Sequence, residues 1–463
     1  MNWTVAKLVE ATHGELLQGN AERVIRGVST DTRALKPGDC FVPLTGETHD
    51  GHDFIPHALA KNVGAVLSSR RDIESIIPRD VTLIRVVDTL YGLGELARYQ
   101  RGKHPIPVIG ITGSNGKTST KEMIAAVLGV KHNVHKNAGN FNNLIGVPLT
   151  LLSLEPHHQA AVIEMGINVF GEMQRLVEIV KPTTGLVTNI HPAHLQGLES
   201  QEHILEEKGR LLTCLSSDDV AIINLDDDRL RSFSKRLKAR TVTYSLADEN
   251  AQVRLAGRVE IERGVSTFPM ALESEVVPVR LAVLGAHQVQ NALAAAAVAY
   301  GMGESIENIV EGLSRHRPVH QRMEIHQLRD GTVLVDDTYN ANPMSMTAAA
   351  RAVVEASRGK PVIFVLGEMR EMGAEGPRLH WEVGSKIGTM KVAKLFTLGG
   401  LAAELNRGAR ESGMPEEACH HASDHEEIIQ LLRDLKIRDS WILVKGSRGM
   451  TMELVVQGLM NAN

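Results

Sequence analysis

A buried strand, a glycine-rich loop and a helix follow one another in residues 107–128, PVIGITGSNGKTSTKEMIAAVL. The apolar run 108–111 has the character of a strand, and the apolar residues of 123–127 recur at helical spacing. A loop between a strand and a helix presents main-chain N–H groups and the positive end of the helix dipole to an anion. This segment therefore predicts an α/β fold built around a phosphate-binding loop.

The loop carries the side chains that nucleotide chemistry requires. Its lysine is expected to reach the β- and γ-phosphates, and the threonine after it to ligate Mg²⁺. The general phosphate-loop motif also requires a glycine at position 111, where this chain has Ile111. A chance glycine-rich turn is the alternative, but the strand before and the helix after favour a phosphate loop. The candidate ATP-binding residues are Gly113, Ser114, Asn115, Gly116, Lys117, Thr118 and Ser119.

Composition excludes several other classes of protein. The 463 residues have a formal net charge of -5, so no basic surface for nucleic acid is expected. No apolar run approaches the roughly 18 residues of a membrane span, and the first residues do not have the pattern of a signal peptide. Cys40, Cys214 and Cys419 are scattered, which is typical of a reducing cytoplasm. We expect a cytoplasmic chain without a membrane span.

Two proline-punctuated junctions, near residues 101–107 and 317–322, divide the chain into three α/β units. The expected domains are 1–102, 103–318 and 319–463. In the middle unit, short apolar segments such as AAVIEMGI and VAIINLD alternate with helical patterns. Strands of this kind are typical of a parallel sheet buried on both faces.

Three polar residues of the middle unit lie at or beyond successive strand ends, where α/β sheets bind their ligands. Glu164 closes AAVIE, His194 follows GLVTNIHPA, and Lys208 lies on the helix after it. Taken singly, they could be a helix cap, a loop histidine and a solvated lysine. Their common placement predicts a site that binds Mg²⁺ beside the phosphates.

Further candidates lie downstream. Asn291 is early in a predicted helix, where its amide could reach a base edge or be a surface amide. The segment LVDDTYNANP places Asp337 and Asn342 after a predicted strand, and it could form a ribose site or an ordinary turn. Lys445 and Arg448 in VKGSRGM suit a carboxylate or phosphate, or form a generic basic turn. Residues 419–425, CHHASDH, contain metal-ligand types, but adjacent histidines in a polar stretch are more typical of a solvated loop.

These segments, in their order, resemble the Mur ligase superfamily. The resemblance is carried by TGSNGKTSTKEM, GNFNNLIGVPLTLL, VIEMGIN, NIHPAHLQGL, EKGRL, DDTYNANP, LGEMREMG and VKGSRGMTME, from about Val28 to the C-terminus. DDTYNANP together with GNFNNLIGVP is most similar to the member that acts on a UDP-linked tripeptide and D-alanyl-D-alanine. The implied fold has three domains: a UDP-substrate domain, a central ATPase domain and a C-terminal Rossmann-like domain.

The resemblance implies an ATP-dependent amide ligase of peptidoglycan synthesis, monomeric, with UDP-N-acetylmuramoyl-tripeptide and D-alanyl-D-alanine as substrates. It also implies two Mg²⁺ ions, with Thr118 and Glu164 on one and His194 and a carbamylated Lys208 on the other. Asn291 would lie by the adenine, Arg322 by the γ-phosphate and Asp337 by the ribose. The implied substrate-binding residues are Ser29, Thr30, Asp31, Thr32, Arg33, Asn140, Asn142, Asn143, Asn342, Lys445 and Arg448.

Three rival interpretations remain. A folylpolyglutamate-type or other Mur ligase would change the substrate, and the first unit, which resembles the UDP-binding domain, argues against the folate enzyme. A phosphate-loop switch or motor would hydrolyse ATP without D-alanyl-D-alanine, and it leaves the asparagine-rich loops unexplained. A non-catalytic nucleotide-binding module would not need Lys117, Glu164 and Lys208 together.

Overall fold

The structure is a computed structural model that describes residues 3–46, 48–191, 200–262, 264–435 and 438–461. The chain forms two compact units. The first comprises Met1–Ile111, His132–Ile167 and Gly171–Gly185, and the second comprises Thr112–Lys131, Asn168–Phe170 and Leu186–Asn463.

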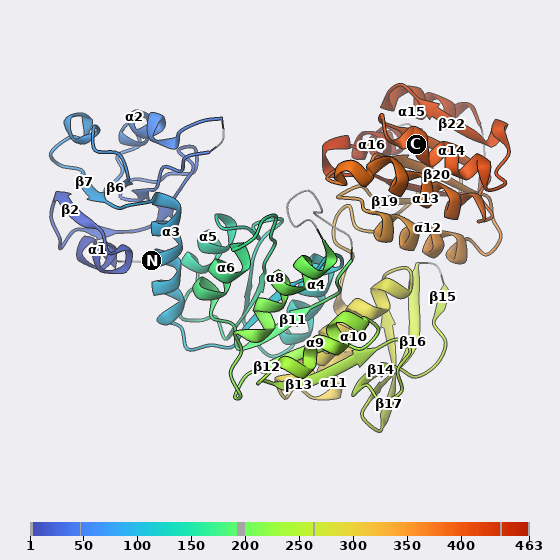
Figure 1. Ribbon diagram of the computed structural model, residues 1–463, viewed down its shortest axis with the longest axis horizontal. Helices are drawn as coiled ribbons and strands as arrows, with labels where there is room; N and C mark the ends of the chain where they lie inside the picture. The colour runs from blue at the N-terminus through green and yellow to red at the C-terminus, as the bar shows by residue number, and fades with distance from the viewer. Residues whose placement is uncertain (1–2, 47, 192–199, 263, 436–437, 462–463) are drawn as a thin grey trace. The chain divides into compact units, whose positions relative to one another are not determined.

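The first unit opens with a five-stranded sheet of order β2-β7-β6-β5-β4 (blue in Figure 1). Its strands are parallel except for the edge strand β2, which pairs antiparallel with β7. β5 and β6 lie in the apolar segments DCFVPL and AVLSS, and α2 lies between them in the chain. The elements are β1 (Trp3–Thr4), α1 (Val5–Thr12), β2 (Glu15–Gln18), β3 (Val24–Ile25), β4 (Val28–Ser29), β5 (Cys40–Phe41), α2 (Ile55–Leu59), β6 (Ala65–Ser68), β7 (Thr82–Arg85) and α3 (Thr89–Gly102).

The second sheet has the order β15-β16-β14-β13-β12-β11-β8-β10-β9, with β17 on β16. The pairings β8–β10, β9–β10 and β12–β13 are parallel, as the apolar strand segments predict. Its strands are β8 (Val108–Thr112), β9 (Val134–Lys136), β10 (Ala160–Glu164), β11 (Thr184–Val187), β12 (Val220–Asn224), β13 (Arg240–Ser245), β14 (Val253–Leu255), β15 (Glu260–Glu262), β16 (Val265–Leu272) and β17 (Glu275–Leu281).

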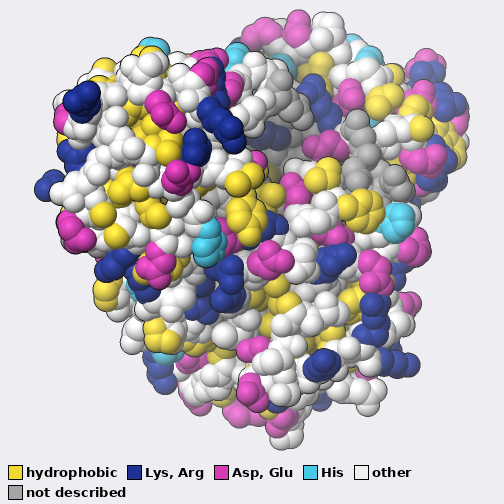
Figure 2. All heavy atoms as spheres, turned by 60° about the vertical axis from the view of Figure 1, so that its left-hand side comes forward, with side chains coloured by type: hydrophobic (Ala, Val, Ile, Leu, Met, Phe, Trp, Pro, Cys, Tyr) yellow, Lys and Arg dark blue, Asp and Glu magenta, His cyan; other side chains and the backbone are white. Residues whose placement is uncertain are grey.

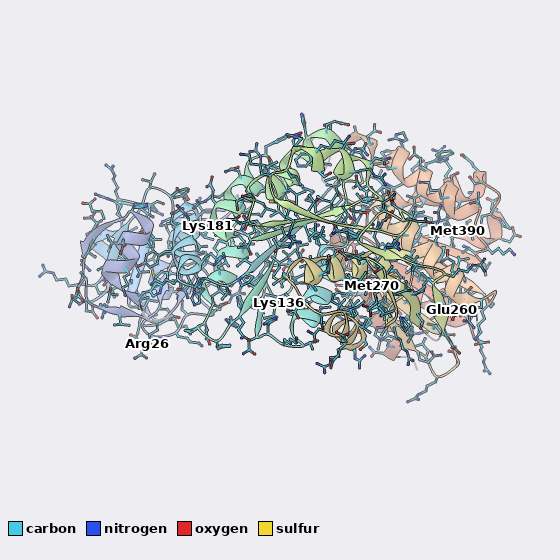
Figure 3. All side chains as sticks on the ribbon, turned by 90° about the horizontal axis from the view of Figure 1, so that it is seen from below. Arg26, Lys136, Lys181, Glu260, Met270 and Met390 are labelled. Atoms are coloured by element: carbon cyan, nitrogen blue, oxygen red, sulfur yellow. The ribbon has the colours of Figure 1, made fainter. Side chains whose placement is uncertain are left out.

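The simple alternation of strands and helices expected for this region fails between β14 and β17. These four strands are consecutive, and β16 pairs antiparallel with β14, β15 and β17. Antiparallel neighbours can be joined by short connections, as β16 and β17 are by residues 273–274, so no crossover helix is needed. Figure 3 labels Glu260 on β15 and Met270 on β16; Met270 is fully buried. The accompanying helices are α4 (Lys117–Leu128), α5 (Gly146–Leu152), α6 (Glu172–Val180), α8 (Gln201–Thr213), α9 (Asp228–Phe233), α10 (Ala286–Gly301) and α11 (Ile306–Arg315).

The C-terminal sheet has the order β18-β19-β23-β20-β21-β22 and carries helices on both faces (orange and red in Figure 1). Alternate residues of its strands enter two separate cores. Val335 and Phe364 pack with α12, α13 and α14, whereas Leu334 and Ile363 pack with α15 and α16. The elements are β18 (Glu324–Gln327), β19 (Val333–Asp337), α12 (Pro343–Ser357), β20 (Val362–Gly367), α13 (Gly376–Gly388), β21 (Lys394–Leu398), α14 (Ala402–Glu411), β22 (Cys419–Ala422), α15 (His425–Asp434), β23 (Trp441–Lys445) and α16 (Glu453–Asn461).

The charge on one face and the character of the helices bear on possible partners. On the face displayed in Figure 2, Lys and Arg side chains are interspersed with Asp and Glu. None of the helices in the described ranges combines the length and the apolar character needed to cross a bilayer.

Candidate active site

The glycine loop joins β8 to α4, the strand and the helix that the sequence predicts on its two sides, and α4 begins at Lys117. Gly113 has φ +143° and Gly116 has φ +81°, conformations that residues with a Cβ rarely adopt. A Cβ on Gly113 would lie 1.9 Å from Thr188 Oγ1. These two glycines therefore allow both the turn and the close approach of the next strand end.

Side chains at the end of β11 hold the loop in shape. Thr188 Oγ1 donates to the carbonyl of Asn115 (2.6 Å), and Asn189 Oδ1 accepts from the Asn115 N–H (2.9 Å). Ser114 Oγ donates to the carbonyl of His191 (2.8 Å) and accepts from its N–H (2.9 Å). The sequence analysis did not single out Thr188, Asn189 or His191. The available signal was a polar TNIH directly after a buried strand.

Lys117 lies over the loop that it closes. Its Nζ donates to the carbonyl of Gly113 at 2.8 Å and to that of Ser114 at 3.4 Å. An ammonium group at this position faces the concave side of the loop, where the phosphates of a nucleotide bind. The loop and its lysine thus form a preorganised cationic cradle.

Lys208 is 1% exposed on α8, so the alternative of a solvated lysine does not hold. Burial lowers its pKa well below the usual value; the charge of Lys117 lowers it further, and that of Glu207 opposes the shift. Glu207 is equally buried and pairs with Arg210 at 3.0 Å. A buried lysine beside a second cation favours the neutral amine.

Asn291 packs directly on the loop from α10. A Cβ on Gly116 would lie 2.4 Å from Asn291 Oδ1. The Asn291 amide is 8% exposed and donates to Gln288 Oε1 at 3.1 Å. Its interpretation as a surface amide is therefore wrong.

Arg322 reaches the loop from the start of the C-terminal part. Its Nη2 donates to Thr118 Oγ1 at 3.0 Å, and its guanidinium lies 4.0 Å from the ring centroid of Tyr339. The neighbours of Arg322 in the chain, Gln321 and Met323, have φ +60° and +57°. Two such conformations in one turn are costly and require support from the surroundings.

Asn342 makes a second bridge to the loop. Its Nδ2 donates to Asn115 Oδ1 at 2.6 Å, while its Oδ1 accepts from the N–H of Ser345 at the start of α12. Asn342 is thus both the N-cap of this helix and a loop contact. LVDDTYNANP is therefore more than the ordinary turn considered as an alternative.

Asp337 and Lys445 form a buried ion pair. They are directly opposite in the parallel pair β19–β23, and Lys445 Nζ lies 2.6 Å from Asp337 Oδ2. Lys445 also donates to the carbonyl of Asn340 at 2.8 Å. His287, which was not predicted from the sequence, interacts electrostatically with this pair. Burial lowers the pKa of His287 to about 4; the charge of Asp337 opposes this shift, and the charge of Lys445 adds to it.

The remaining basic candidate of the C-terminal part, Arg448, lies near the surface. Its Nη1 is 2.9 Å from Glu453 Oε1 and 3.3 Å from Gln321 Oε1. Arg448 thus contacts the residue that precedes Arg322. His194 lies outside the described residues.

In the first unit, Glu164 ends β10 and is 2% exposed. Its Oε1 accepts from Asn142 Nδ2 at 2.8 Å, and Asn137 hydrogen-bonds the main-chain N–H and C=O of Glu164. Glu164 is paired in register with Ile111, two residues before the loop glycine Gly113. Asn142 therefore orients a buried carboxylate at a strand end.

Asn140 and Asn143, which flank Asn142 in the chain, make other contacts. Asn143 Oδ1 accepts from the N–H groups of Ile145 and Gly146, just before α5 and at its first residue. The carbonyl of Asn140 accepts from the Asn142 N–H at 2.7 Å. These contacts shape the loop that carries Asn142.

The segment Ser29–Arg33 forms a compact polar turn at the end of β4. Arg33 pairs with Asp31 at 2.8 Å and also donates its N–H to Asp31 Oδ1. These hydrogen bonds lower the pKa of the Asp31 carboxyl. Thr30 and Thr32 are partly exposed between them. The turn offers hydroxyls, a carboxylate and a guanidinium to a polar ligand.

The oxygen ligands that Mg²⁺ prefers are present in both units. Thr118 supplies a hydroxyl next to the loop lysine, and Glu164 supplies a buried carboxylate that Asn142 orients. The donor chemistry of these residues fits magnesium.

Comparison with known proteins gives a consistent pattern along the chain. Residues 24–101 match the profile "Mur ligase family, catalytic domain", residues 111–299 match "Mur ligase middle domain", and residues 321–448 match "Mur ligase, glutamate ligase domain". The chain is 35% identical over 460 residues to the UDP-N-acetylmuramoyl-tripeptide–D-alanyl-D-alanine ligase of Bacillus subtilis, covering 99% of this chain and 98% of that protein.

Solved structures agree with this pattern. The crystal structure of MurF from Acinetobacter baumannii superposes with a TM-score of 0.90 at 30% identity, covering 100% of this chain and 99% of the other. The MurF ligase of Thermotoga maritima, crystallised with ADP, superposes with a TM-score of 0.83 at 26% identity and covers 94% and 97% of the two chains.

Proposed function

This chain belongs to the Mur ligase family, and we propose that it joins D-alanyl-D-alanine to UDP-N-acetylmuramoyl-tripeptide with hydrolysis of ATP. The observation that carries the proposal is the match to ligases of that name over nearly the whole length of both chains. Three Mur ligase profiles match the chain, and one of them covers residues 24–101, the part that resembles the UDP-substrate domain. The presence of this part argues against a folate ligase. We assign the domains as 1–102, 103–318 and 319–463.

The proposed reaction begins when the terminal carboxylate of the tripeptide attacks the γ-phosphorus of ATP. Two anions meet in this step, so the protein must neutralise charge before and during transfer. Lys117 and the loop N–H groups hold the β- and γ-phosphates, and Arg322 approaches the γ-phosphate from the Thr118 side. ADP leaves as the acyl phosphate forms. The amine of D-alanyl-D-alanine then attacks the acyl carbon, and phosphate and a proton are released as the amide bond forms.

Thr118 and Glu164 are the ligands that we propose for one magnesium ion, and His194 and Lys208 for a second. A magnesium ion held by these residues would screen the charge of the triphosphate and act as a Lewis acid on the γ-phosphoryl group. Asn142 keeps Glu164 oriented through the 2.8 Å hydrogen bond, as outer-shell partners of metal ligands do.

Lys208 would serve as a ligand after carbamylation. The lone pair of the neutral amine attacks carbon dioxide: a new N–C bond forms as one C=O π bond opens, and one proton leaves to solvent, which converts the neutral amine into an anionic carbamate. Only the neutral amine has that lone pair. Burial and Lys117 both lower the pKa of Lys208, and this supports the modification.

The substrate-binding roles rest on the resemblance and on the local chemistry. We propose that Ser29–Arg33 contact the UDP moiety and that Asn140, Asn142 and Asn143 line the approach to the sugar-peptide. Asn291 contacts the adenine, Asp337 the ribose, and Asn342, Lys445 and Arg448 bind D-alanyl-D-alanine. We propose a monomeric enzyme of the cytoplasm.

One assay tests the function. Phosphate release is measured with ATP, UDP-N-acetylmuramoyl-tripeptide and D-alanyl-D-alanine together, and again with each omitted in turn. Release should require all three, and mass spectrometry should detect the UDP-linked pentapeptide. ATP hydrolysis that does not depend on D-alanyl-D-alanine would instead indicate a switch or motor.

A further inference from the structure

Three potential metal ligands meet on the first two strands of the C-terminal sheet. Glu324 and Asp336 are paired directly across β18 and β19, and His326 follows Glu324 by two residues, on the same face. One ligand atom from each lies within 4.8 Å of the other two. Small side-chain rotations would bring all three within the roughly 2.0–2.2 Å of a metal bond. It is the one such group found among the described residues.

Two carboxylates directly opposite each other repel, and such cross-strand pairs destabilise a sheet unless a cation intervenes. Among the described residues, neither Glu324 nor Asp336 forms an ion pair with a lysine or arginine. Glu324 is 2.8 Å from the exposed His320 and 4.0 Å from His326.

The carboxylates are oriented as metal ligands usually are. Asp336 Oδ1 accepts from Thr338 Oγ1 at 2.6 Å and from the Thr338 N–H at 3.1 Å, and Asp336 is 2% exposed. Glu324 Oε2 accepts from the N–H of Gln321 at 3.2 Å. The Glu324 and His326 side chains are 28% and 21% exposed, so an ion could enter from solvent.

We propose that Glu324, His326 and Asp336 bind one Zn²⁺ ion, with His320 available as a fourth ligand. A mixed imidazole and carboxylate set favours zinc over magnesium, which prefers oxygen ligands and retains its water. The site shares no residue with the magnesium ligands proposed above. Its role would be structural, because the ion would link β18 to β19 beside the turn that carries Arg322.

The turn shows why such a link would matter. Gln321 and Met323 both have positive φ, and these conformations persist only where the surroundings hold them. His320 and Glu324 flank the turn on its two sides, and Arg322 between them donates to Thr118. An ion bound to Glu324 and Asp336 would anchor the C-terminal end of this turn.

The test measures Zn²⁺ bound to the full-length protein in excess Mg²⁺ at pH 7.5. Zinc is counted by mass spectrometry after gel filtration, and its affinity is measured by competition with a chromogenic chelator. The variants are His326→Gln and Glu324→Gln, which remove a ligand with little change in size. His420→Gln is the matched control, because His420 pairs with Glu427 at 2.6 Å and belongs to no three-ligand group in the described ranges.

The wild type and His420→Gln should retain one more zinc equivalent than the other two variants, or bind that equivalent at least tenfold more tightly. Co²⁺ substitution supplies a second readout, because its visible absorption reports the ligands directly and should change only in His326→Gln and Glu324→Gln. Equal zinc content and equal cobalt spectra in all four proteins would overturn the proposal. Absence of bound zinc from the wild type would overturn it as well.

Discussion

The phosphate loop and the C-terminal contacts upon it are built in opposite ways. Gly113, Gly116, Lys117 and Thr118 lie within six residues, and the positive φ angles of the two glycines form the turn that carries them. The residues that contact this loop from the C-terminal part come from distant segments: Arg322 precedes β18, and Asn342 caps α12. A loop of the first kind survives the loss of one side chain, since its glycines maintain the turn. Contacts of the second kind depend on several elements at once.

This difference predicts separate effects of mutation. Changes in the loop should affect chemistry and leave the fold intact. Changes in the C-terminal contacts should affect chemistry and stability together, because the same side chains hold elements in place. The changes at Lys117 and Arg322 test this contrast directly, and the changes at Lys208 and His287 test buried residues near the two regions; the four are taken from the largest expected effect to the smallest.

Lys208→Ala should abolish detectable ligase activity. The lysine is buried beside Lys117, and if it is carbamylated, alanine removes an anionic magnesium ligand. Acetate or formate at millimolar to molar concentration should restore part of the activity by occupying the vacated space. Phosphate release is measured in each salt against matched chloride.

Two results would contradict this prediction. Full activity of Lys208→Ala would exclude the residue from the mechanism. An unmodified amine in a structure of the active complex would exclude carbamylation.

Lys117→Ala should lower kcat by on the order of a hundredfold or more, as the loss of other preorganised charge stabilisers does. Its Tm without nucleotide should change little, because the two glycines preserve the turn. The exposed Lys131, just beyond α4, supplies the control variant Lys131→Ala. Near-normal turnover of Lys117→Ala would contradict the proposed role.

Arg322→Lys keeps the charge but loses the planar group that hydrogen-bonds Thr118 and stacks on Tyr339. We expect kcat/KM to fall by roughly tenfold, equivalent to about 1.4 kcal/mol, and Tm to fall as well. The exposed Arg329 supplies the control variant Arg329→Lys. If Arg322→Lys lowered activity without any change in Tm, the proposed contrast between the two regions would fail.

The sequence predicted the loop well because its signal is local. Strand, glycines, lysine and helix stand in one run, and the structure has β8, the loop and α4 in this predicted order. The parallel strands were equally visible, because burial on both faces requires uninterrupted apolar residues. The hairpins β14–β17 were missed because their residues do not form such runs.

Contacts made through the fold could not be predicted from spacing. Lys208 reads as a surface lysine in EEKGRLL, and only the packing of α8 shows that it is buried. Two such contacts join segments that are distant in the sequence: the hydrogen bond from Thr188 to Asn115 and the ion pair of Asp337 with Lys445. The roles of the magnesium ligands, the substrate loops and the three domain boundaries remain predictions.

His287 should make stability depend on pH in a defined window. Its pKa is about 4 in the folded chain, because burial disfavours the imidazolium, against about 6.5 in an unfolded one. Between these values the unfolded chain binds the proton and the folded chain does not. The contribution of His287 to stability is therefore complete above pH 6.5 and is lost as the pH falls towards 4, with a slope of at most about 1.4 kcal/mol per pH unit.

His287→Asn removes the titrating group beside Asp337 and Lys445, so its Tm should fall less steeply than that of the wild type between pH 6.5 and 4. The measurement is Tm at half-unit pH steps, with the exposed His57 replaced in His57→Asn as the control. The Tm of His57→Asn should follow that of the wild type at every pH. The difference in Tm between His287→Asn and the wild type should shrink as the pH falls from 6.5 to 4. Parallel curves for all three proteins would mean that the folded chain does not hold His287 neutral. This effect is the smallest of the four because, above pH 6.5, the ring is mostly uncharged in the folded and the unfolded chain alike.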